Sequence, residues 1–200
     1  MRLMDRGILV NEEGERFVEE LERRDVISNA IKEQTGNYAY LLWDKTGVDE
    51  TGLFDNHPGE VKMCTEYGTL FEGDTLEAVA EAAGVDADAL VKTVEHWNEM
   101  CEKGVDEDFM KSPEYLIPVK NPPFYAFNEK WVFVCSIAGV HTNDKFQVLN
   151  ADHEVIPGLF AAGNTVGRRF GYAYESSGMG MSNSQAMVAG YVAGETAAKA

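Results

Sequence analysis

The residues best suited to chemistry gather near the end of the chain. Gly178 and Gly180 stand two residues apart, and Ser182 and Asn183 follow at the start of a segment rich in alanine and glycine. Small residues let a backbone approach a sheet or a bound cofactor closely. On spacing alone, these glycines have two explanations: a tight strand–turn–helix packing, or a backbone that faces a ligand.

A second chemically capable group lies just before this segment. The loop there holds two cations, two phenols and a carboxylate: Arg168, Arg169, Tyr172, Tyr174 and Glu175. Upstream, His141 and Thr142 directly follow Gly139 and Val140. A lone histidine beside a strand is commonly a hydrogen-bonded loop residue, and an arginine pair between glycines is commonly an exposed basic turn. Both groups therefore also have an ordinary structural explanation.

Composition limits the partners of this 200-residue chain. It carries 17 Lys and Arg against 34 Asp and Glu, a formal net charge of −17. Proteins that bind nucleic acids or anionic membranes concentrate positive charge, so this balance argues against both classes. No apolar run approaches the roughly 20 residues of a membrane span, and the N-terminus lacks a signal-peptide core. We expect a cytoplasmic protein with no membrane span.

Cysteine and histidine spacing predicts no metal site. The cysteines are odd in number and widely separated: Cys64, Cys101 and Cys135. They match neither a disulfide framework nor a zinc motif, so we expect reduced thiols with structural roles. His57, His96 and His153 are expected at the surface or on a helix face, and no role is assigned to them.

The elements expected to position these groups are strands and helices in an α+β fold. Apolar and β-branched runs predict strands, the first two joined as a hairpin, over residues 7–11, 16–18, 38–44, 124–148 and 158–164. The last of these is expected to be buried and to run into a tight turn. Residues 45–58 contain Gly47, Gly52 and Pro58 and are expected to form a loop.

Helices are expected where capping residues and apolar spacing agree. Asp74 and Glu77 form a capping-box pair for a helix over residues 75–83. The other predicted helices are one capped by Asp25 and ending near Gly36, one capped by Asp86 and ending at Gly104, and one over residues 181–198.

Three passages resemble the FAD-dependent fumarate reductase/succinate dehydrogenase flavoprotein superfamily. They are residues 11–20 with Arg24–Asp25, residues 84–98 with 106–109, and residues 155–164 with 178–195. The most specific is the run Ile156-Pro157-Gly158-Leu159-Phe160-Ala161-Ala162-Gly163-Asn164. The resemblance covers nearly the whole chain. It is strongest to the soluble fumarate reductases and extends to the 3-ketosteroid dehydrogenases.

This resemblance implies a capping domain over residues 1–125 and an incomplete C-terminal segment of an FAD-binding domain over residues 126–200. Relatives begin with a Rossmann half whose Gly-x-Gly-x-x-Gly turn seats the FAD pyrophosphate, and this chain has no such turn. FAD is therefore expected in the intact protein but weakly bound or absent in this chain alone. The implied cofactor-binding residues are His141, Gly163, Asn164, Gly180, Ser182 and Asn183.

The missing half also bears on partners and location. The implied partners are a small-molecule substrate and either an N-terminal Rossmann half or a second copy of the chain. The resemblance also leaves room for an export signal ahead of that half. Apolar surface that would face the half is expected to be exposed here.

Arg24 matches the arginine that delivers a proton to the substrate as hydride arrives from reduced flavin. A guanidinium pKa above about 12 makes it a poor acid in isolation, so this role needs a relay and a strong field, or else a clamp on developing negative charge. Spacing alone favours an ordinary ion pair of Arg24 with Asp25 or Glu20. The resemblance favours the catalytic role.

The resemblance also implies the residues that hold the substrate. His141 and Thr142 match a motif that touches substrate and flavin, although many relatives carry two adjacent histidines there. Fumarate-reducing relatives place a carboxylate-clamping arginine where this chain has Ser177. Arg168 or Arg169 could replace that clamp. Alternatively, Tyr172 and Tyr174 could polarise a ketone.

The implied function is reduction of an activated C=C bond in a small unsaturated acid or enone. Alternatives are dehydrogenation of a ketone-bearing substrate such as a steroid, and a non-catalytic remnant that serves as a binding or interaction domain. The chain by itself is expected to be inactive.

Overall fold

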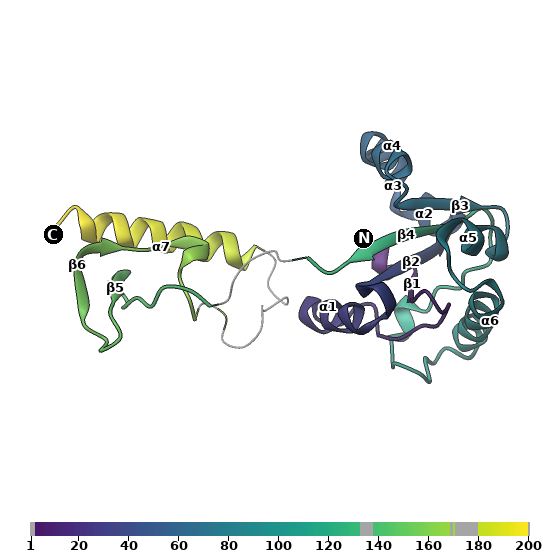
Figure 1. Ribbon diagram of the computed structural model, residues 1–200, viewed down its shortest axis with the longest axis horizontal. Coiled ribbons are helices and arrows are strands. Elements are labelled where there is room, and N and C mark those ends of the chain that lie inside the picture. Colours follow the sequence, from purple (N-terminus) through teal and green to yellow (C-terminus); the bar gives the residue numbers. More distant parts are fainter. Residues whose placement is uncertain (1–2, 133–137, 169, 171–179, 200) are drawn as a thin grey trace. The chain divides into compact units, whose positions relative to one another are not determined.

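The computed structural model describes residues 3–132, 138–168, 170 and 180–199. The chain divides into two compact units, Met1–Trp131 and Val132–Ala200 (Figure 1). Both contain helices and strands, which confirms the predicted α+β class. Among the residues described, no helix is both long enough and apolar enough to cross a bilayer.

The first unit is built on a four-stranded antiparallel sheet. Its strands, in the order β1-β2-β4-β3, are β1 (Ile8–Val10), β2 (Tyr38–Asp44), β4 (Phe124–Lys130) and β3 (Leu70–Gly73). The strand predicted over residues 38–44 is confirmed with the same bounds. β4 pairs with β2 along its whole length, so the first unit continues to Trp131, past the boundary expected after residue 125.

Helices surround this sheet. Their bounds are α1 (Arg24–Glu33), α2 (Lys45–Thr51), α3 (Leu53–Asn56), α4 (Pro58–Glu66), α5 (Leu76–Ala83) and α6 (Ala87–Lys103). Short 3-10 turns occur at Leu3–Asp5, Thr35–Asn37 and Pro113–Tyr115. The predicted cap of α6 is confirmed, because the Asp86 side chain accepts a hydrogen bond from the Ala89 amide at 2.9 Å.

Alternate residues of β2 enter two separate hydrophobic cores. Tyr40 and Leu42 pack with side chains from α5 and α6 on one face of the sheet. Leu41 and Trp43 pack with side chains from α1 and α2 on the other. Because side chains alternate along a strand, a strand covered on both faces is apolar throughout. This explains the unbroken apolar run that predicted β2.

Two helix starts differ from the sequence prediction. Asp25 does not cap α1: the N-cap is Arg23, which makes no capping hydrogen bond with its side chain. At α5 the cap is Thr75 rather than Asp74, and its hydroxyl accepts from the Ala78 amide at 3.1 Å. Asp25 instead lies in the first turn of α1, where a carboxylate still favours the helix dipole.

The loop predicted over residues 45–58 is wrong, because α2, α3 and the start of α4 occupy it. The Asp44 side chain caps α2 by accepting from the Gly47 amide at 3.2 Å, and Gly52 ends α2 with a φ of 61°. Pro58 stands in the first turn of α4, where its missing N–H costs nothing. Glycine and proline therefore mark helix ends here.

A buried charge network of Arg16, Glu20, Asp106 and Lys111 joins distant parts of the first unit. Arg16 contacts Glu20 (Nε–Oε1, 2.8 Å) and Asp106 (Nη2–Oδ2, 2.8 Å). Lys111 contacts the second Glu20 oxygen (Nζ–Oε2, 3.0 Å). None of the four side chains is more than 4% exposed. The Arg16 guanidinium also lies 4.6 Å from the centroid of the Trp97 ring.

Pairing within the charge network shifts two pKa values. Burial alone would lower the pKa of Arg16 and raise that of Asp106. Their mutual hydrogen bonds outweigh burial, with Glu20 also accepting from Arg16 and the Phe109 and Lys111 amides donating to Asp106. The pKa of Arg16 is therefore raised, and the pKa of Asp106 is lowered to about 2.

We expect Asp106 to make the first unit sensitive to acid. Because its folded-state pKa lies below the ordinary value of 3.8, Asp106 stabilises the fold above that value. The contribution, roughly 1–2 kcal/mol, is lost as the pH falls from about 4 to about 2. Urea unfolding between pH 6 and pH 2.5 should show a shallower pH dependence in Asp106→Asn than in the parent. The exposed-site variant Asp55→Asn should follow the parent, and equal slopes in all three proteins would contradict the assignment.

The second unit contains a short hairpin and one long helix. β5 (Gln147–Leu149) pairs with β6 (Val155–Phe160), Gly163–Thr165 forms a 3-10 turn, and α7 spans Met181–Ala197. The helix predicted from residue 181 is confirmed. Of the predicted 124–148 strand region, the described residues form strands only at its two ends.

β6 is not the buried strand predicted from residue 158, because most of it is exposed. An apolar strand is buried only where another element packs against it. Besides β6, the described part of this unit contains only the short strand β5 and the helix α7, which leave most of β6 exposed. α7 also keeps an uncovered face: Ala189 and Ala193 are buried, whereas Met187 and Tyr191 are 75% and 74% exposed.

Candidate functional site

Arg24 is the first residue of α1, and its side chain is exposed. The two carboxylates that spacing favours as its partners, Asp25 and Glu20, are paired with other cations. Arg23 contacts Asp25 (Nη2–Oδ2, 3.1 Å), and Glu20 belongs to the charge network. Within the described part of the chain, the Arg24 side chain makes no ion pair or hydrogen bond. The ordinary ion pair that spacing favours for Arg24 is therefore not formed.

The position of Arg24 also works against helix stability. The N-terminus of a helix carries the positive end of the helix dipole, so a cation there is unfavourable by about 0.3–1 kcal/mol. No side chain caps α1, and only the Asp25 carboxylate in the first turn counters this cost. Arg24 thus contributes little to the fold, which leaves its cation available to an external anionic group.

In the second unit, the fold brings His141 and Arg168 together. Arg168 Nη1 lies 3.5 Å from His141 Nε2. The segments that carry them are joined by a parallel bridge, in which the Val140 amide donates to the Thr165 carbonyl at 2.8 Å and the Gly167 amide to the Val140 carbonyl at 3.0 Å. Because a guanidinium only donates, this contact is favourable when Nε2 of His141 carries no proton.

Two glycines make this approach possible. A Cβ added at Gly139 would lie 2.3 Å from the Thr165 carbonyl oxygen, and one added at Gly167 would lie 2.7 Å from the Gly139 amide nitrogen. No side chain fits at either position. The close crossing of these two glycines therefore sets His141 beside Arg168.

Arg168 and a second histidine hold unusual backbone conformations around His141. Arg168 has a φ of 60° and His153 a φ of 64°, a region that costs energy for residues other than glycine. The His153 ring meets the His141 ring edge-on, with centroids 5.0 Å apart. Sequence reasoning assigned His153 no role, and no spacing signal pointed to it, because the turn between β5 and β6 creates the contact.

For the other predicted substrate-site residues, the structure gives only a backbone bridge or no description. Thr142 forms a bridge with Val148 next to His141. Tyr174 lies outside the described residues, as do Arg169, Ser177 and Gly178.

The turn at Gly163 and Asn164 packs against α7. Gly163 has a φ of 72°, and a Cβ added there would lie 3.8 Å from the Ala186 side chain of α7. Gly180 is the N-cap of α7 with a φ of 78°, and no side chain caps the helix. Ser182 and Asn183 stand in its first turn. The structure thus brings the Gly163–Thr165 turn to the N-terminal half of α7.

Similarity to known proteins identifies the family of this chain. The sequence profile of the family described as an FAD binding domain matches residues 2–181. The chain belongs to this FAD-binding family.

Three relatives illustrate what the chain is similar to. It is 43% identical to a urocanate reductase of Eggerthella lenta over 171 residues, 86% of the chain and 28% of that enzyme. The open conformation of a flavocytochrome c3 fumarate reductase superposes on 100% of the chain and 34% of that protein, with a TM-score of 0.77 and 29% identity. The 3-ketosteroid Δ1-dehydrogenase of Sterolibacterium denitrificans, solved with 1,4-androstadiene-3,17-dione, covers 98% of the chain over 39% of its own length, with a TM-score of 0.78 and 26% identity.

These matches confirm the resemblance to the fumarate reductase/succinate dehydrogenase flavoproteins and to the 3-ketosteroid dehydrogenases. The chain spans between 28% and 39% of the length of the three proteins.

The described residues fit one end of FAD better than the other. The uncapped N-terminus of α7 favours an electron-rich group such as the pyrimidine edge of a flavin. Among the described residues, a Cβ added at Gly180 would meet no atom within 4 Å. The sequence holds no Gly-x-Gly-x-x-Gly turn for the pyrophosphate.

Proposed function

We propose that this chain is part of an FAD-dependent reductase that adds hydrogen across an activated C=C bond of a small unsaturated acid or enone. The observation that carries the proposal is Arg24, an exposed cation with no carboxylate partner among the described residues, at a helix end that does not favour it. Family membership and the similarity to proteins named urocanate reductase and fumarate reductase support it.

Each proposed role follows from the chemistry of a side chain. Arg24 stabilises the negative charge that develops on the substrate when one alkene carbon receives hydride. It also directs a proton to the other alkene carbon. Arg168, with Thr142 and Tyr174, donates hydrogen bonds to the substrate carboxylate or carbonyl. His141 orients Arg168 through the contact of its Nε2 with Nη1 of Arg168. Bound FAD would supply the hydride.

The proposed cofactor contacts lie in the second unit. Gly163, Asn164, Gly180, Ser182 and Asn183, with His141, would hold the flavin ring. We propose that residues 1–125 belong to a capping domain, which β4 extends to Trp131, and that the residues after it belong to an FAD-binding domain. The exposed side chains of Met187 and Tyr191 on α7 support a partner in the form of a Rossmann half or a second copy of the chain. We also propose a cytoplasmic location, which fits the reduced thiols expected from the cysteine spacing.

A chimera tests the proposed activity. In it, this chain replaces the matching segment of the Eggerthella lenta urocanate reductase. Reduction of fumarate, urocanate, acrylate and cyclohexenone is followed under anaerobic conditions with reduced methyl viologen as the electron donor. We expect turnover of at least one of these alkenes. A chimera that binds FAD stoichiometrically and reduces none of them would overturn the proposal.

The second candidate function is dehydrogenation beside a ketone. The TM-score of 0.78 to a 3-ketosteroid Δ1-dehydrogenase favours it, as does Tyr174, whose phenol could polarise a carbonyl. The same chimera, given a 3-ketosteroid and an artificial electron acceptor, separates the two functions. Dehydrogenation without alkene reduction would support this second candidate.

We expect the 200-residue chain alone to bind FAD with a dissociation constant above 1 μM. The physical reason is that the sequence holds no Gly-x-Gly-x-x-Gly turn to bind the pyrophosphate. Calorimetric titration of the purified chain with FAD, and with riboflavin as the phosphate-free control, measures this directly. Similar weak affinities for both ligands are expected, and sub-micromolar FAD binding would contradict the assignment.

A further inference from the structure

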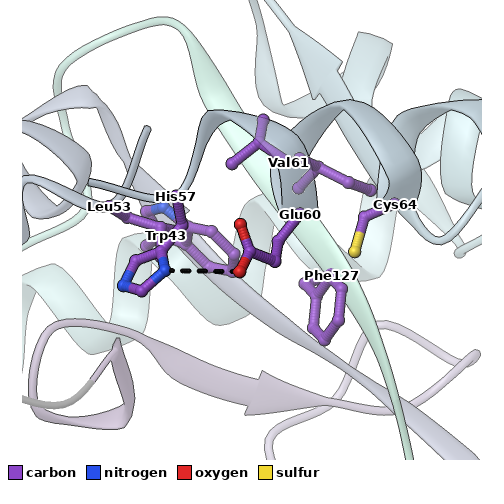
Figure 2. A pocket seen from close by; sticks show the side chains of 8 residues that line it. Trp43, Leu53, His57, Glu60, Val61, Cys64 and Phe127 are labelled. Carbon is purple, nitrogen blue, oxygen red and sulfur yellow. Dashed lines mark ion pairs between the residues drawn. The ribbon is translucent and has the colours of Figure 1, made fainter. Parts of the chain in front are cut away.

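A cavity of about 300 Å³ lies in the first unit between α4 and the sheet. Trp43, Leu70 and Phe127 contribute to it from β2, β3 and β4. Val61 and Cys64 contribute from α4, and Figure 2 shows the Cys64 sulfur directed toward Phe127. The size is at the lower end of the range for small-molecule sites, and it suits a single aromatic ring with small substituents.

The interior of this cavity is apolar, but its edge is not. His57 and Glu60 face each other there, as Figure 2 shows, with Nδ1 and Oε1 3.7 Å apart. This ion-pair separation is longer than a hydrogen bond, and the His57 and Glu60 side chains are 55% and 67% exposed, so both can also reach a ligand or water at the cavity edge. A hydroxyl placed between them would accept from the imidazole N–H and donate to the carboxylate.

Trp43 is the tryptophan of the cavity wall, and the environment of its indole N–H differs from that of Trp97. Its side chain is 1% exposed, and among the described residues its indole N–H has no hydrogen-bond acceptor. Buried polar groups without a partner are rare in native structures. Trp97, by contrast, donates its indole N–H to the Ile117 carbonyl at 2.9 Å.

The charge of the chain and of Glu60 limits the chemical class of ligand that the cavity can bind. The sequence carries a formal net charge of −17, and Glu60 stands at the cavity edge, so an anion would be repelled. A cation would have to leave water for an apolar interior. A neutral ring with one hydroxyl matches both the interior and the edge.

We propose that this cavity binds a small neutral phenol, with the ring between α4 and Trp43 and the hydroxyl between His57 and Glu60. The site lies wholly within the first unit and uses none of the residues proposed for alkene reduction. It is therefore independent of the proposed function, and either can fail without the other.

The three tryptophans of the chain supply the test. The ¹⁵N-labelled chain is titrated with p-cresol, with toluene as the matched ring lacking a hydroxyl, and with benzoate as an anion. We expect p-cresol to shift the Trp43 indole resonance saturably, with a dissociation constant in the millimolar range. The resonances of Trp97 and Trp131 should stay in place. Trp43→Phe assigns the reporting signal.

Substitutions on α4 separate this site from general hydrophobic binding. Val61→Phe should fill the cavity and abolish the shift, whereas Met63→Phe adds the same ring to an exposed position of α4 and should leave it. Glu60→Ala should weaken p-cresol binding about 5-fold to 10-fold and leave toluene unchanged. Glu66→Ala, an exposed change on the same helix outside the cavity, should alter neither affinity.

Each contrary result overturns a defined part of the proposal. No saturable Trp43 shift with p-cresol, equal shifts of all three indoles, or binding that survives Val61→Phe would remove the site. Equal affinities for p-cresol and toluene, or tighter binding of benzoate, would remove the assignment to neutral phenols.

Discussion

Arg24→Ala is expected to lower the kcat of alkene reduction by the flavin-loaded chimera about 10²-fold to 10⁴-fold, with its FAD content unchanged. This is the range for loss of a proton donor or of a group that stabilises transition-state charge. Because Arg24 has no partner among the described residues, its removal breaks no contact there that stabilises the fold. Steady-state kinetics with the best substrate of the panel, together with flavin absorbance, measure both quantities.

Arg23 provides the matched control for this experiment. It is the preceding residue and carries the same side chain, but it is paired with Asp25 and is 54% exposed. We expect Arg23→Ala to change kcat less than 3-fold. Arg24→Lys should restore only part of the activity, since an ammonium keeps the charge but not the planar fork. Equal, small effects of both alanine variants would remove Arg24 from the mechanism.

Local signals in the sequence predicted much of the first unit. Residues 38–44 form a strand because both faces are covered, and Asp86 caps α6 because its carboxylate reaches the Ala89 amide. The same kind of signal misled at residues 45–58, where Gly52 and Pro58 delimit helices. A glycine or proline marks a change of backbone conformation, and tertiary contacts decide whether the flanking residues form helices or loops.

The candidate site was less predictable because it depends on contacts between distant residues. The resemblance predicted His141 and Arg168 as site residues. The contact between their side chains depends on the close crossing of Gly139 and Gly167, which the sequence did not reveal. The ring contact of His153 with His141 depends in turn on the hairpin of β5 and β6. For Arg24, the resemblance predicts a catalytic role, whereas spacing alone predicts an ion pair with Asp25 or Glu20. In the structure Asp25 pairs with Arg23 instead.

Glu20→Gln is expected to lower the free energy of unfolding of the first unit by about 3–5 kcal/mol. Glu20 is the shared acceptor of the charge network, because its carboxylate receives hydrogen bonds from Arg16, Lys111 and the Leu9 amide. An amide in its place leaves the Lys111 ammonium, which is 0% exposed, with only carbonyl acceptors such as that of Gly7. Urea unfolding at pH 7, followed by tryptophan fluorescence, measures the loss.

An exposed ion pair of the same unit provides the control. Glu102 contacts Lys120 at 2.6 Å, yet their side chains are 69% and 45% exposed. Glu102→Gln should therefore cost less than about 1 kcal/mol.

The double variant Glu20→Gln/Lys111→Met should recover part of the stability lost in Glu20→Gln, because it removes the buried charge that the single substitution leaves unpaired. Failure of the double variant to recover any stability would mean that Glu20 acts mainly through Arg16 and the backbone. A loss in Glu20→Gln no larger than in Glu102→Gln would mean that the buried charges are hydrated in solution. Either result would move the origin of the stability of this unit from the charge network to the two apolar cores on either side of β2.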